Sequence, residues 1–302
     1  MPTDTYDAIV VGGSFAGLSA AMQLARARRR VLVVDAGRPR NRFAHASHGF
    51  FGQDGRTPAD ILETARAQVL AYPTAELLRD EAASARSAEG AFEVVMRSGA
   101  AATARRLVLA TGVVDELADV PGLRERWGVS VLHCPYCHGY EVADRRLGLL
   151  AVGEASLHLA QMLPDWSPHV VLFTNGAVEP TDEQREAIER RGVRIETRRV
   201  AALEGEGLEL AGVRLHDGST VEIDALFTGS RVRMASPLAE QLGCAFDEAP
   251  MGPLIRTDGQ KETTVPGVYA AGDAARSWHN ATFASADGVQ AGVSAHRSLA
   301  LG

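Results

Sequence analysis

The residues whose types and spacing most directly suggest chemistry are two cysteines, Cys134 and Cys137, separated by two residues. Two thiols at this spacing can close a disulfide or hold one sulfur as a thiolate, and the start of a helix would lower the thiol pKa. Pro135 is compatible with an early helical position. His138 directly follows the pair and His133 directly precedes it, so a proton acceptor or donor is at hand; His133 or a water is the alternative to His138 in this role. The segment predicts a redox pair with Cys134, Cys137 and His138 as catalytic residues.

A zinc site is the main alternative for a CxxC pair. Zinc takes four ligands, usually with a second CxxC or histidine pair at a recognisable spacing, and this chain has none. His133 and His138 could join the two sulfurs, but four ligands within six residues would fit a tetrahedral ion poorly. We therefore expect no metal. The third cysteine, Cys244, stands alone and is expected to be a small core residue.

The elements that must position this chemistry begin near the N-terminus with a βαβ unit. The run 7–11 is apolar without alternation, as in a buried parallel strand, and a glycine-rich turn follows at 12–17. Helical periodicity covers 18–28, and 31–35 reads as a second buried strand. A strand, a glycine turn and a helix within about thirty residues are typical of dinucleotide-binding folds.

The turn at 12–17 nearly matches the dinucleotide fingerprint. Gly12 and Gly17 fill its first and third glycine positions, and Ser14 stands at the second. These positions allow a tight turn, a close approach of backbone to pyrophosphate, and close helix–strand packing. Asp35, 23 residues after Gly12, suits a ribose 2′-hydroxyl. We expect Gly12, Ser14, Ala16, Gly17 and Asp35 to bind a nucleotide; the alternative is an ordinary glycine-rich bend.

A second turn of this kind opens at Gly153, after an apolar strand at 147–152, and suggests an internal duplication. Only the first glycine of the fingerprint remains there. Glu154 would place a negative charge beside the phosphates, and His158 occupies the position where helix and strand must pack closely. The loop after the next strand, 174–176, offers no arginine for the 2′-phosphate of NADPH. These features predict a retained fold with a degenerate nucleotide site; a working NAD(P)H site is the alternative.

The rest of the chain continues the alternation of strands and helices. We expect strands at 92–96, 105–109, 169–173, 193–195 and 268–271. We expect helices at 57–71, after 155 as far as 163, at 181–191 and at 281–299. This alternation is typical of an α/β protein.

Length and charge limit the remaining possibilities. At roughly 150 residues per domain, 302 residues suggest two domains, each with its own core. The formal charge of −7 and the lack of a basic run argue against nucleic acid and anionic membrane as partners. No apolar run near the start is long enough for a signal peptide or a membrane span, so we expect a cytoplasmic protein. In a reducing cytoplasm, a close cysteine pair favours redox chemistry over a structural disulfide.

Four pieces of the sequence, in this order, resemble the low-molecular-weight thioredoxin reductase family of flavoproteins. They are the glycine turn at 12–17, Ala-Thr-Gly at 110–112, the CxxC pair inside an inserted second domain, and Thr-Val-Pro-Gly-Val-Tyr-Ala-Ala-Gly-Asp at 264–273. The pieces span nearly the whole chain, and the ordered set is more specific than any one motif. The resemblance implies FAD as the cofactor and a homodimer as the assembly.

The resemblance also implies roles for single residues in cofactor binding. Asp273 would contact the ribitol of FAD, and Thr111, Gly112 and Gly272 would lie in loops that hold the cofactor. The last helix, beginning near Ala281, would point its N-terminus at the flavin, where positive potential stabilises the reduced anion.

The cysteine segment carries both the match and the main departures. By resemblance, Cys137 would face the flavin and Cys134 would exchange with the substrate. His138 stands where thioredoxin reductases usually carry an aspartate. Together with Gly-Gly-Ser-Phe-Ala-Gly at 12–17 and His-Gly-Phe-Phe-Gly at 48–52, this looks closer to the dithiol oxidases of the gliotoxin and holomycin type, which pass electrons to oxygen. A thioredoxin reductase fed by NADPH or ferredoxin, or a redox-sensing flavoprotein without turnover, is the alternative.

We therefore predict an α/β protein with two Rossmann-like, three-layer nucleotide-binding domains, the second inserted into the first. The FAD-binding domain would span 1–114 and 246–302, and the CxxC-bearing domain, with its degenerate NAD(P)H site, would span 115–245. The substrate would be a small-molecule or peptide dithiol or disulfide, or a thioredoxin-like protein. Four side chains could line an aromatic pocket near the flavin, or be core or interface residues: Phe50, Phe51, Trp278 and His279.

Overall fold

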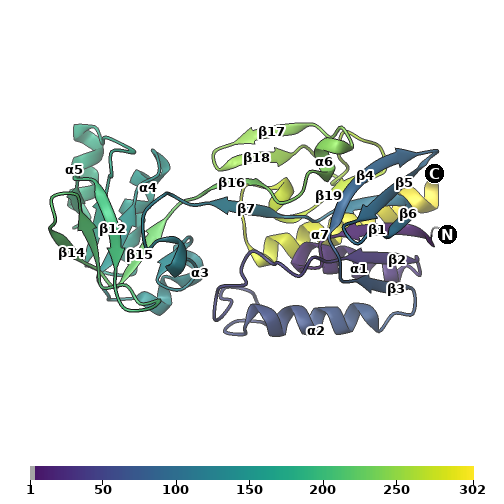
Figure 1. The fold of residues 1–302 in the computed structure, drawn as a ribbon, viewed down its shortest axis with the longest axis horizontal. Helices are drawn as coiled ribbons and strands as arrows, with labels where there is room; N and C mark the ends of the chain where they lie inside the picture. The colour runs from purple at the N-terminus through teal and green to yellow at the C-terminus, as the bar shows by residue number, and fades with distance from the viewer. Residues whose placement is uncertain (1–3) are drawn as a thin grey trace. The chain divides into compact units, whose positions relative to one another are not determined.

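The computed structural model describes residues 4–302 (Figure 1), which divide into two compact units. The terminal unit contains residues 4–42, 58–114 and 232–302. The inserted unit contains residues 43–57 and 115–231. Each unit has its own sheet and its own apolar core, so each is a folded body in its own right.

The terminal unit is built on a seven-stranded sheet in the order β3-β2-β1-β6-β5-β4, with β19 beside β6. Its strands are β1 (Asp4–Val11), β2 (Val31–Val34), β3 (Ala75–Leu78), β4 (Ala82–Ala88), β5 (Ala91–Met96), β6 (Ala101–Leu109) and β19 (Val268–Ala270). β1, β2, β3, β6 and β19 run parallel, whereas β5 pairs antiparallel with both β6 and β4. Because parallel strands end at one edge, the segments after β1, β6 and β19 begin at the same edge of the sheet.

Smaller elements complete the terminal unit. Its helices are α1 (Phe15–Arg26), α2 (Pro58–Leu70), α6 (Leu238–Gln241) and α7 (Ala281–Leu301), with a 3-10 turn, η4 (Gly272–Ala275). The strands β17 (Phe246–Ala249) and β18 (Gly252–Ile255) form an antiparallel hairpin. The strands β7 (Val113–Glu116) and β16 (Arg231–Met234), where the chain passes between the units, pair with each other.

The strand β1 is apolar throughout because layers cover both of its faces. Ala8 and Val10 lie in one buried cluster with residues of α1 and α7, whereas Ile9 and Val11 lie in another with residues of β5, β6 and α6. Successive side chains of a strand point to opposite faces, so a strand between two layers needs apolar residues at every position. This packing explains the unbroken apolar run that predicted the strand.

The helices α1 and α7 cross in close contact, because two glycines of α7 remove the side chains between them. A Cβ placed on Gly288 would lie 2.0 Å from the carbonyl oxygen of Ala16, and one on Gly292 would lie 2.5 Å from that of Ala20. Both distances are far shorter than any contact between real atoms. The glycines of α7 therefore fix how closely it packs on α1, whose first turn follows the strand β1.

The inserted unit has a five-stranded parallel sheet and a separate antiparallel meander. The sheet order is β11-β10-β9-β15-β8, and the meander order is β12-β13-β14. The strands are β8 (Val131–Leu132), β9 (Leu147–Leu150), β10 (Val170–Phe173), β11 (Arg194–Glu196), β12 (Val200–Glu204), β13 (Gly212–Leu215), β14 (Thr220–Glu222) and β15 (Ala225–Thr228). The helices are α3 (Pro135–His138), α4 (Ala155–Met162) and α5 (Asp182–Arg190), with 3-10 turns η1 (Arg124–Arg126), η2 (Tyr140–Val142) and η3 (Leu163–Asp165).

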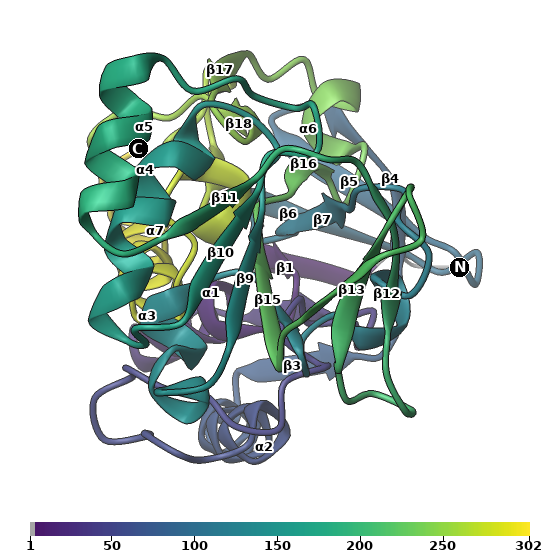
Figure 2. The same ribbon diagram turned by 90° about the vertical axis from the view of Figure 1, so that its left-hand side faces the viewer.

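The inserted unit has three layers. Leu147 and Leu149 of β9 pack in one cluster with α4 and α5, and Leu150 packs in another with the meander. Figure 2 shows α4 and α5 on one side of β9, β10 and β15, and the meander on the other. Both units thus combine a parallel sheet with a β-α-β opening, β1-α1-β2 in one and β9-α4-β10 in the other. The predicted α/β class with two Rossmann-like bodies is confirmed.

The observed boundaries differ from the predicted ones at two places. The chain returns to the terminal unit at Val232 rather than at 246, because Leu238 and Ala239 of α6 pack in the same buried cluster as β1 and β6. Cys244 lies in that cluster and is buried, as expected. The segment 43–57 groups with the inserted unit, not with the residues that flank it in sequence. Neither of these boundaries is marked in the sequence by a change in hydrophobic periodicity.

Two further findings concern residues 4–302 as a whole. Within this range no helix is long and apolar enough to cross a membrane. The same residues contain no group of three or more histidine, cysteine or acidic side chains placed to hold a metal ion.

The crossing of α1 and α7 leads to a stability prediction. Replacing Gly288 by alanine would add up to about 1 kcal/mol of helix propensity, but the clash with the Ala16 carbonyl should outweigh it. We expect the free energy of unfolding of Gly288→Ala to fall by about 1–3 kcal/mol, as for other overpacked sites. Thermal and urea denaturation measure this. Gly259→Ala is the control, because a Cβ there meets nothing within 4 Å; a stabilised Gly288→Ala protein would contradict the packing described.

Candidate active site

The glycine turn after β1 has the steric demands of a nucleotide-binding turn. Gly12 has a φ of +112°, and a Cβ on it would lie 2.1 Å from the carbonyl oxygen of Ala110. A Cβ on Gly17 would lie 1.7 Å from the carbonyl oxygen of Gly12. Only glycine fits at these two positions, so they have the roles of the first and third fingerprint glycines.

The first turn of α1 supplies the other features that a pyrophosphate needs. Ser14 is the N-cap residue with extended backbone, and its hydroxyl makes no capping hydrogen bond to the helix. The small side chain of Ser14 keeps the helix start open to a ligand, and backbone N–H groups at a helix start attract phosphate. Ala16, also predicted to bind the nucleotide, is buried beside Gly272 and Gly288. Gly13 also has a role that the sequence reasoning missed. A Cβ on it would lie 2.5 Å from Cγ of Asp35, so glycine is required for the carboxylate to approach the turn.

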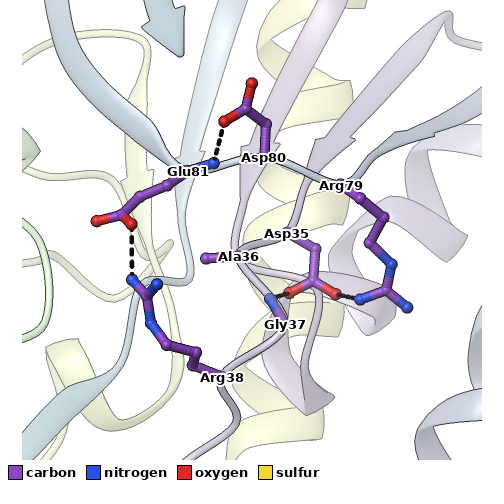
Figure 3. Close-up of a pocket in the computed structure, with 7 residues that line it drawn as sticks. All are labelled: Asp35, Ala36, Gly37, Arg38, Arg79, Asp80 and Glu81. Atoms are coloured by element: carbon purple, nitrogen blue, oxygen red, sulfur yellow. Dashed lines mark hydrogen bonds and ion pairs between the residues drawn. The ribbon is translucent and has the colours of Figure 1, made fainter. Parts of the chain in front are cut away.

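Asp35 is buried at the end of β2 beside a cavity of about 240 Å³ (Figure 3). One carboxylate oxygen, Oδ1, accepts a hydrogen bond from the backbone N–H of Gly37 at 2.9 Å. The other, Oδ2, lies 2.5 Å from Nη1 of Arg79. Arg38 and Glu81, which pair at 2.9 Å, also line this cavity. A polar cavity beside the carboxyl group of Asp35 fits the hydroxyl groups of a ribose.

The loops after β6 and β19 reach the same edge of the sheet as the glycine turn. Gly112 has a φ of +67° and open space where a Cβ would lie, which fits a close approach of a ligand to the backbone of Thr111 and Gly112. Gly272, with a φ of +74°, starts η4, and Oδ2 of Asp273 accepts a hydrogen bond from Nη1 of Arg40 at 3.0 Å. The residues predicted to hold FAD thus follow four neighbouring strands, β2, β1, β6 and β19.

The N-terminus of α7 is partly capped by its own chain. The side-chain oxygen of Asn280 accepts hydrogen bonds from the backbone N–H groups of Thr282 at 2.7 Å and Phe283 at 3.3 Å. That the N-terminus of α7 stabilises a reduced flavin stays a prediction from the resemblance.

The cysteine pair lies at the start of a short helix, as the sequence predicts. Cys134 is the N-cap of α3 with extended backbone, and Pro135 occupies the first helical position. Both cysteines are free thiols, and their Sγ atoms lie 2.7 Å apart. The pair can therefore form a disulfide through motion of the side chains alone.

Hydrogen bonds lower the pKa of Cys134 to about 7, from an ordinary value of 9.0. The largest cause is the thiol of Cys137, which donates to the Cys134 sulfur, and the backbone N–H groups of Cys137 and Tyr136 add to it. Burial of the sulfur acts in the opposite direction and is outweighed. Cys134 is thus the sulfur that is readily a thiolate at neutral pH, which matches its predicted role as the exchanging cysteine.

His138 is the last residue of α3, one helical turn after Cys134. Burial is the main cause that lowers the pKa of its imidazole below the ordinary value. The nearby carboxylate of Glu141 raises this pKa, and His48, from the segment 43–57, lowers it. Burial therefore favours the neutral form of the His138 imidazole, which can accept a proton. The sequence reasoning found His138 but missed His48 and Glu141.

The second glycine turn differs in detail from what the sequence suggested. Glu154, the N-cap residue of α4, has an exposed side chain that lies 3.5 Å from Nε2 of Gln184. The expectation for His158 is wrong, because its side chain is exposed and does not enter the contact between helix and sheet. The reason is one of register. The helix α4 starts two residues after Gly153, whereas α1 starts three residues after Gly12.

An arginine lies over the loop that was expected to have none. Nη1 of Arg199 lies 3.4 Å from the carbonyl oxygen of Asn175, and a Cβ on Gly176 would lie 2.9 Å from Nη2 of Arg199. Arg199 comes from the connection between β11 and β12, not from the loop after β10. The two adjacent arginines at 198 and 199 follow the strand predicted at 193–195. They were the sequence signal from which an arginine near this loop could have been predicted.

The four aromatic candidates are divided between the two units. Phe50 and Phe51 belong to the inserted unit, where Phe51 is almost fully exposed. Trp278 and His279 belong to the terminal unit, where Trp278 is exposed and contacts the ring of Phe283. The aromatic pocket stays a prediction.

Comparison with known proteins identifies the family. Residues 6–288 match the pyridine nucleotide-disulphide oxidoreductase family. A protein of Claviceps purpurea named thioredoxin reductase tcpT is 34% identical over 98% of this chain and 95% of its own length. The crystal structure of an oxidoreductase from Agrobacterium tumefaciens is 47% identical, with a TM-score of 0.94, over 98% of this chain and 99% of its own. The crystal structure of HlmI is 40% identical, with a TM-score of 0.91, over 97% and 92% respectively.

These matches extend over both units and confirm the resemblance to thioredoxin reductases that four motifs predicted. Proteins of this type depend on a flavin, so FAD is the expected cofactor, and the four strand ends of the terminal unit fit it. The chain is an oxidoreductase that belongs to the pyridine nucleotide-disulphide oxidoreductase family and is of the thioredoxin reductase type.

Proposed function

We propose that this protein is an FAD-dependent dithiol oxidase that closes a disulfide in a small molecule or peptide, with oxygen as the final electron acceptor. The observation that carries the proposal is Glu154 at the start of α4, where the family binds the pyrophosphate of a nicotinamide nucleotide. A carboxylate there repels phosphate. The resemblance of the segments 12–17, 48–52 and 134–141 to dithiol oxidases of the gliotoxin and holomycin type supports the same function.

The residues that would hold FAD are those of the terminal unit. The first turn of α1, with Gly12, Ser14 and Gly17, would take the pyrophosphate, Asp35 the ribose, and Asp273 the ribitol. When bound, FAD supplies the acceptor for the two electrons that the reduced cysteine pair releases.

The cysteine site can carry out the thiol chemistry with its own residues. Neutral His138 accepts the proton of a substrate thiol, and the resulting thiolate attacks Sγ of Cys134 in the enzyme disulfide. The bond between Cys134 and Cys137 breaks, and Cys137 leaves as a thiolate. The second substrate thiol gives its proton to the Cys137 thiolate and attacks the substrate sulfur of the mixed disulfide, so that Cys134 leaves as a thiolate whose pKa is about 7. The substrate has lost two electrons and two protons, and the cysteine pair is reduced.

A thioredoxin reductase fed by NADPH is the second candidate, because Arg199 lies where a 2′-phosphate could be bound. Its substrate would be a thioredoxin-like protein. A ferredoxin-fed reductase and a redox sensor without turnover are further alternatives. A homodimeric assembly and a cytoplasmic location stay predictions from the sequence.

The electron partner can be identified with the flavin as its own indicator. Anaerobic mixing of the holoprotein with dithiothreitol should bleach the flavin absorbance, and admission of air should restore it within the time of one turnover. A flavin that stays reduced in air would exclude the oxidase. Bleaching by micromolar NADPH within seconds would favour the reductase, and lack of steady dithiol consumption in air would favour the sensor.

A second prediction concerns the thiolate. In the reduced protein with Cys244→Ala, the alkylation rate of Cys134 by iodoacetamide should titrate with a midpoint of about pH 7 and fall below it, because protonation removes the nucleophile. Cys137→Ala removes the hydrogen bond that is the largest cause of the lowered pKa of Cys134, so the midpoint should rise toward 9.0. Cys137→Ser, which keeps a donor, should lie between the two. An unchanged midpoint in Cys137→Ala would refute the assignment.

A third prediction concerns cofactor retention. Asp273→Asn removes the carboxylate proposed to bind the ribitol, and the dissociation constant of FAD should rise at least about tenfold, or ~1.4 kcal/mol. Equilibrium dialysis followed by flavin fluorescence measures it. Asp247→Asn is the matched control, because it also breaks an arginine pair in the terminal unit, Asp247 with Arg256 at 2.6 Å. Equal FAD affinities in the two variants would contradict the role of Asp273.

A further inference from the structure

The segment 43–57 brings a histidine to the cysteine site from about ninety residues earlier in the chain. Its core, 47–56, is closed by its own backbone hydrogen bonds, from Ser47 to Arg56 at 2.8 Å and from Gly55 to Ser47 at 2.9 Å. Phe43 packs against Gly128 of the inserted unit, where a Cβ on the glycine would lie 2.8 Å from Cβ of Phe43. The segment is thus a closed loop anchored to the unit that carries the cysteines.

This loop places His48 between two carboxylates. Nε2 of His48 lies 3.3 Å from Oε1 of Glu141, and Nδ1 lies 3.7 Å from Oδ1 of Asp54. Oδ1 of Asp54 also accepts the backbone N–H of Gly49 at 2.8 Å, which holds the aspartate beside the ring. The side chain of His48 is 23% exposed, and those of Glu141 and Asp54 are 39% and 69% exposed, so both carboxylates that flank His48 contact solvent.

Glu141 connects this pair to the catalytic segment. It lies three residues after His138, on η2, which follows α3 after a single residue, Gly139. The side chains of Glu141 and His48 are both close enough to His138 to act on its charge. The other ionisable groups near His138 are Cys134 and Cys137 on α3 and His133 just before it.

We infer that Glu141 and His48 form a proton relay for His138, which makes them positioning residues of the thiol–disulfide exchange. The inference rests on the proposed role of His138 as the base, but it does not depend on whether oxygen, NADPH or ferredoxin exchanges electrons with the flavin.

One proton and no electron moves along the relay. The S–H bond of the substrate thiol breaks as an N–H bond forms on the imidazole of His138. That proton passes to the carboxylate of Glu141, then to Nε2 of His48, while Nδ1 gives up a proton toward Asp54 and water. A neutral imidazole can accept at one nitrogen and donate at the other. His138 is then neutral again, ready for the next substrate thiol.

The charges of the relay also favour this direction. A proton on His48 repels a second proton on His138, whereas the carboxylate of Glu141 attracts one. The two groups therefore act with opposite sign on the same imidazole.

The test is a titration of the His138 imidazole by NMR in the oxidised holoprotein, where neither Cys134 nor Cys137 titrates. His138→Asn assigns the signal. Glu141→Gln should lower the midpoint of His138, because an attracting charge is lost, and His48→Asn should raise it, because a repelling charge is lost. His216→Asn and Glu186→Gln, exposed residues of the same unit, should leave it unchanged.

A kinetic measurement accompanies the titration. At pH 7, the rate of flavin bleaching by dithiothreitol should fall by about tenfold in His48→Asn, against roughly a hundredfold or more in His138→Ala, which removes the base itself. On the acid side, the pH at which the rate falls should move down in Glu141→Gln and up in His48→Asn. His48→Gln must show the same direction as His48→Asn, which guards against a loosened loop.

Unchanged midpoints of His138, or shifts of the same sign in the two variants, would overturn the relay. Failure of the flavin to reoxidise in air would overturn the oxidase and leave the titration result unaffected. The two proposals therefore fail on different measurements.

Discussion

The terminal unit depends on one steric constraint at the end of β1. The carbonyl oxygens of Gly12 and Ala110 occupy the space where side chains would be, so the chain can turn from strand into helix only through glycine. The same tight turn keeps α1 close to the sheet, and the glycines of α7 bring that helix against α1. The strand ends that carry Asp35, Gly112 and Asp273 are thereby held around one helix start.

The inserted unit carries the cysteine pair, and the thiol–disulfide exchange proposed for it needs a proton acceptor and a reactive sulfur. A short helix start and a neighbouring thiol lower the pKa of Cys134, and burial keeps His138 neutral. A thiolate and a neutral base then exist at the same pH. The turn before α4 has Glu154 at the N-cap, where the corresponding turn before α1 has Ser14.

What could be predicted from the sequence follows from local physics. Periodicity and spacing alone reveal the apolar run of β1, the glycines at 12 and 17 and the CxxC pair. The α/β class and the cysteine site were therefore predictable. His48 and Arg199 were not, because each reaches its place through a loop whose path depends on packing far along the chain. The return to the terminal unit at Val232 was missed because α6 is a four-residue helix without a periodic pattern.

The grouping of residues 43–57 with the inserted unit has a consequence for dissecting the protein. The chain crosses between the units at 42/43, 57/58, 114/115 and 231/232, so no single continuous stretch contains the whole inserted unit. A recombinant fragment covering only 115–231 would keep both cysteines and His138 but lose His48 and the loop that presents it. The same arrangement ties any insertion or deletion within 43–57 to the acid–base properties of the cysteine site, although the loop is distant from it in sequence.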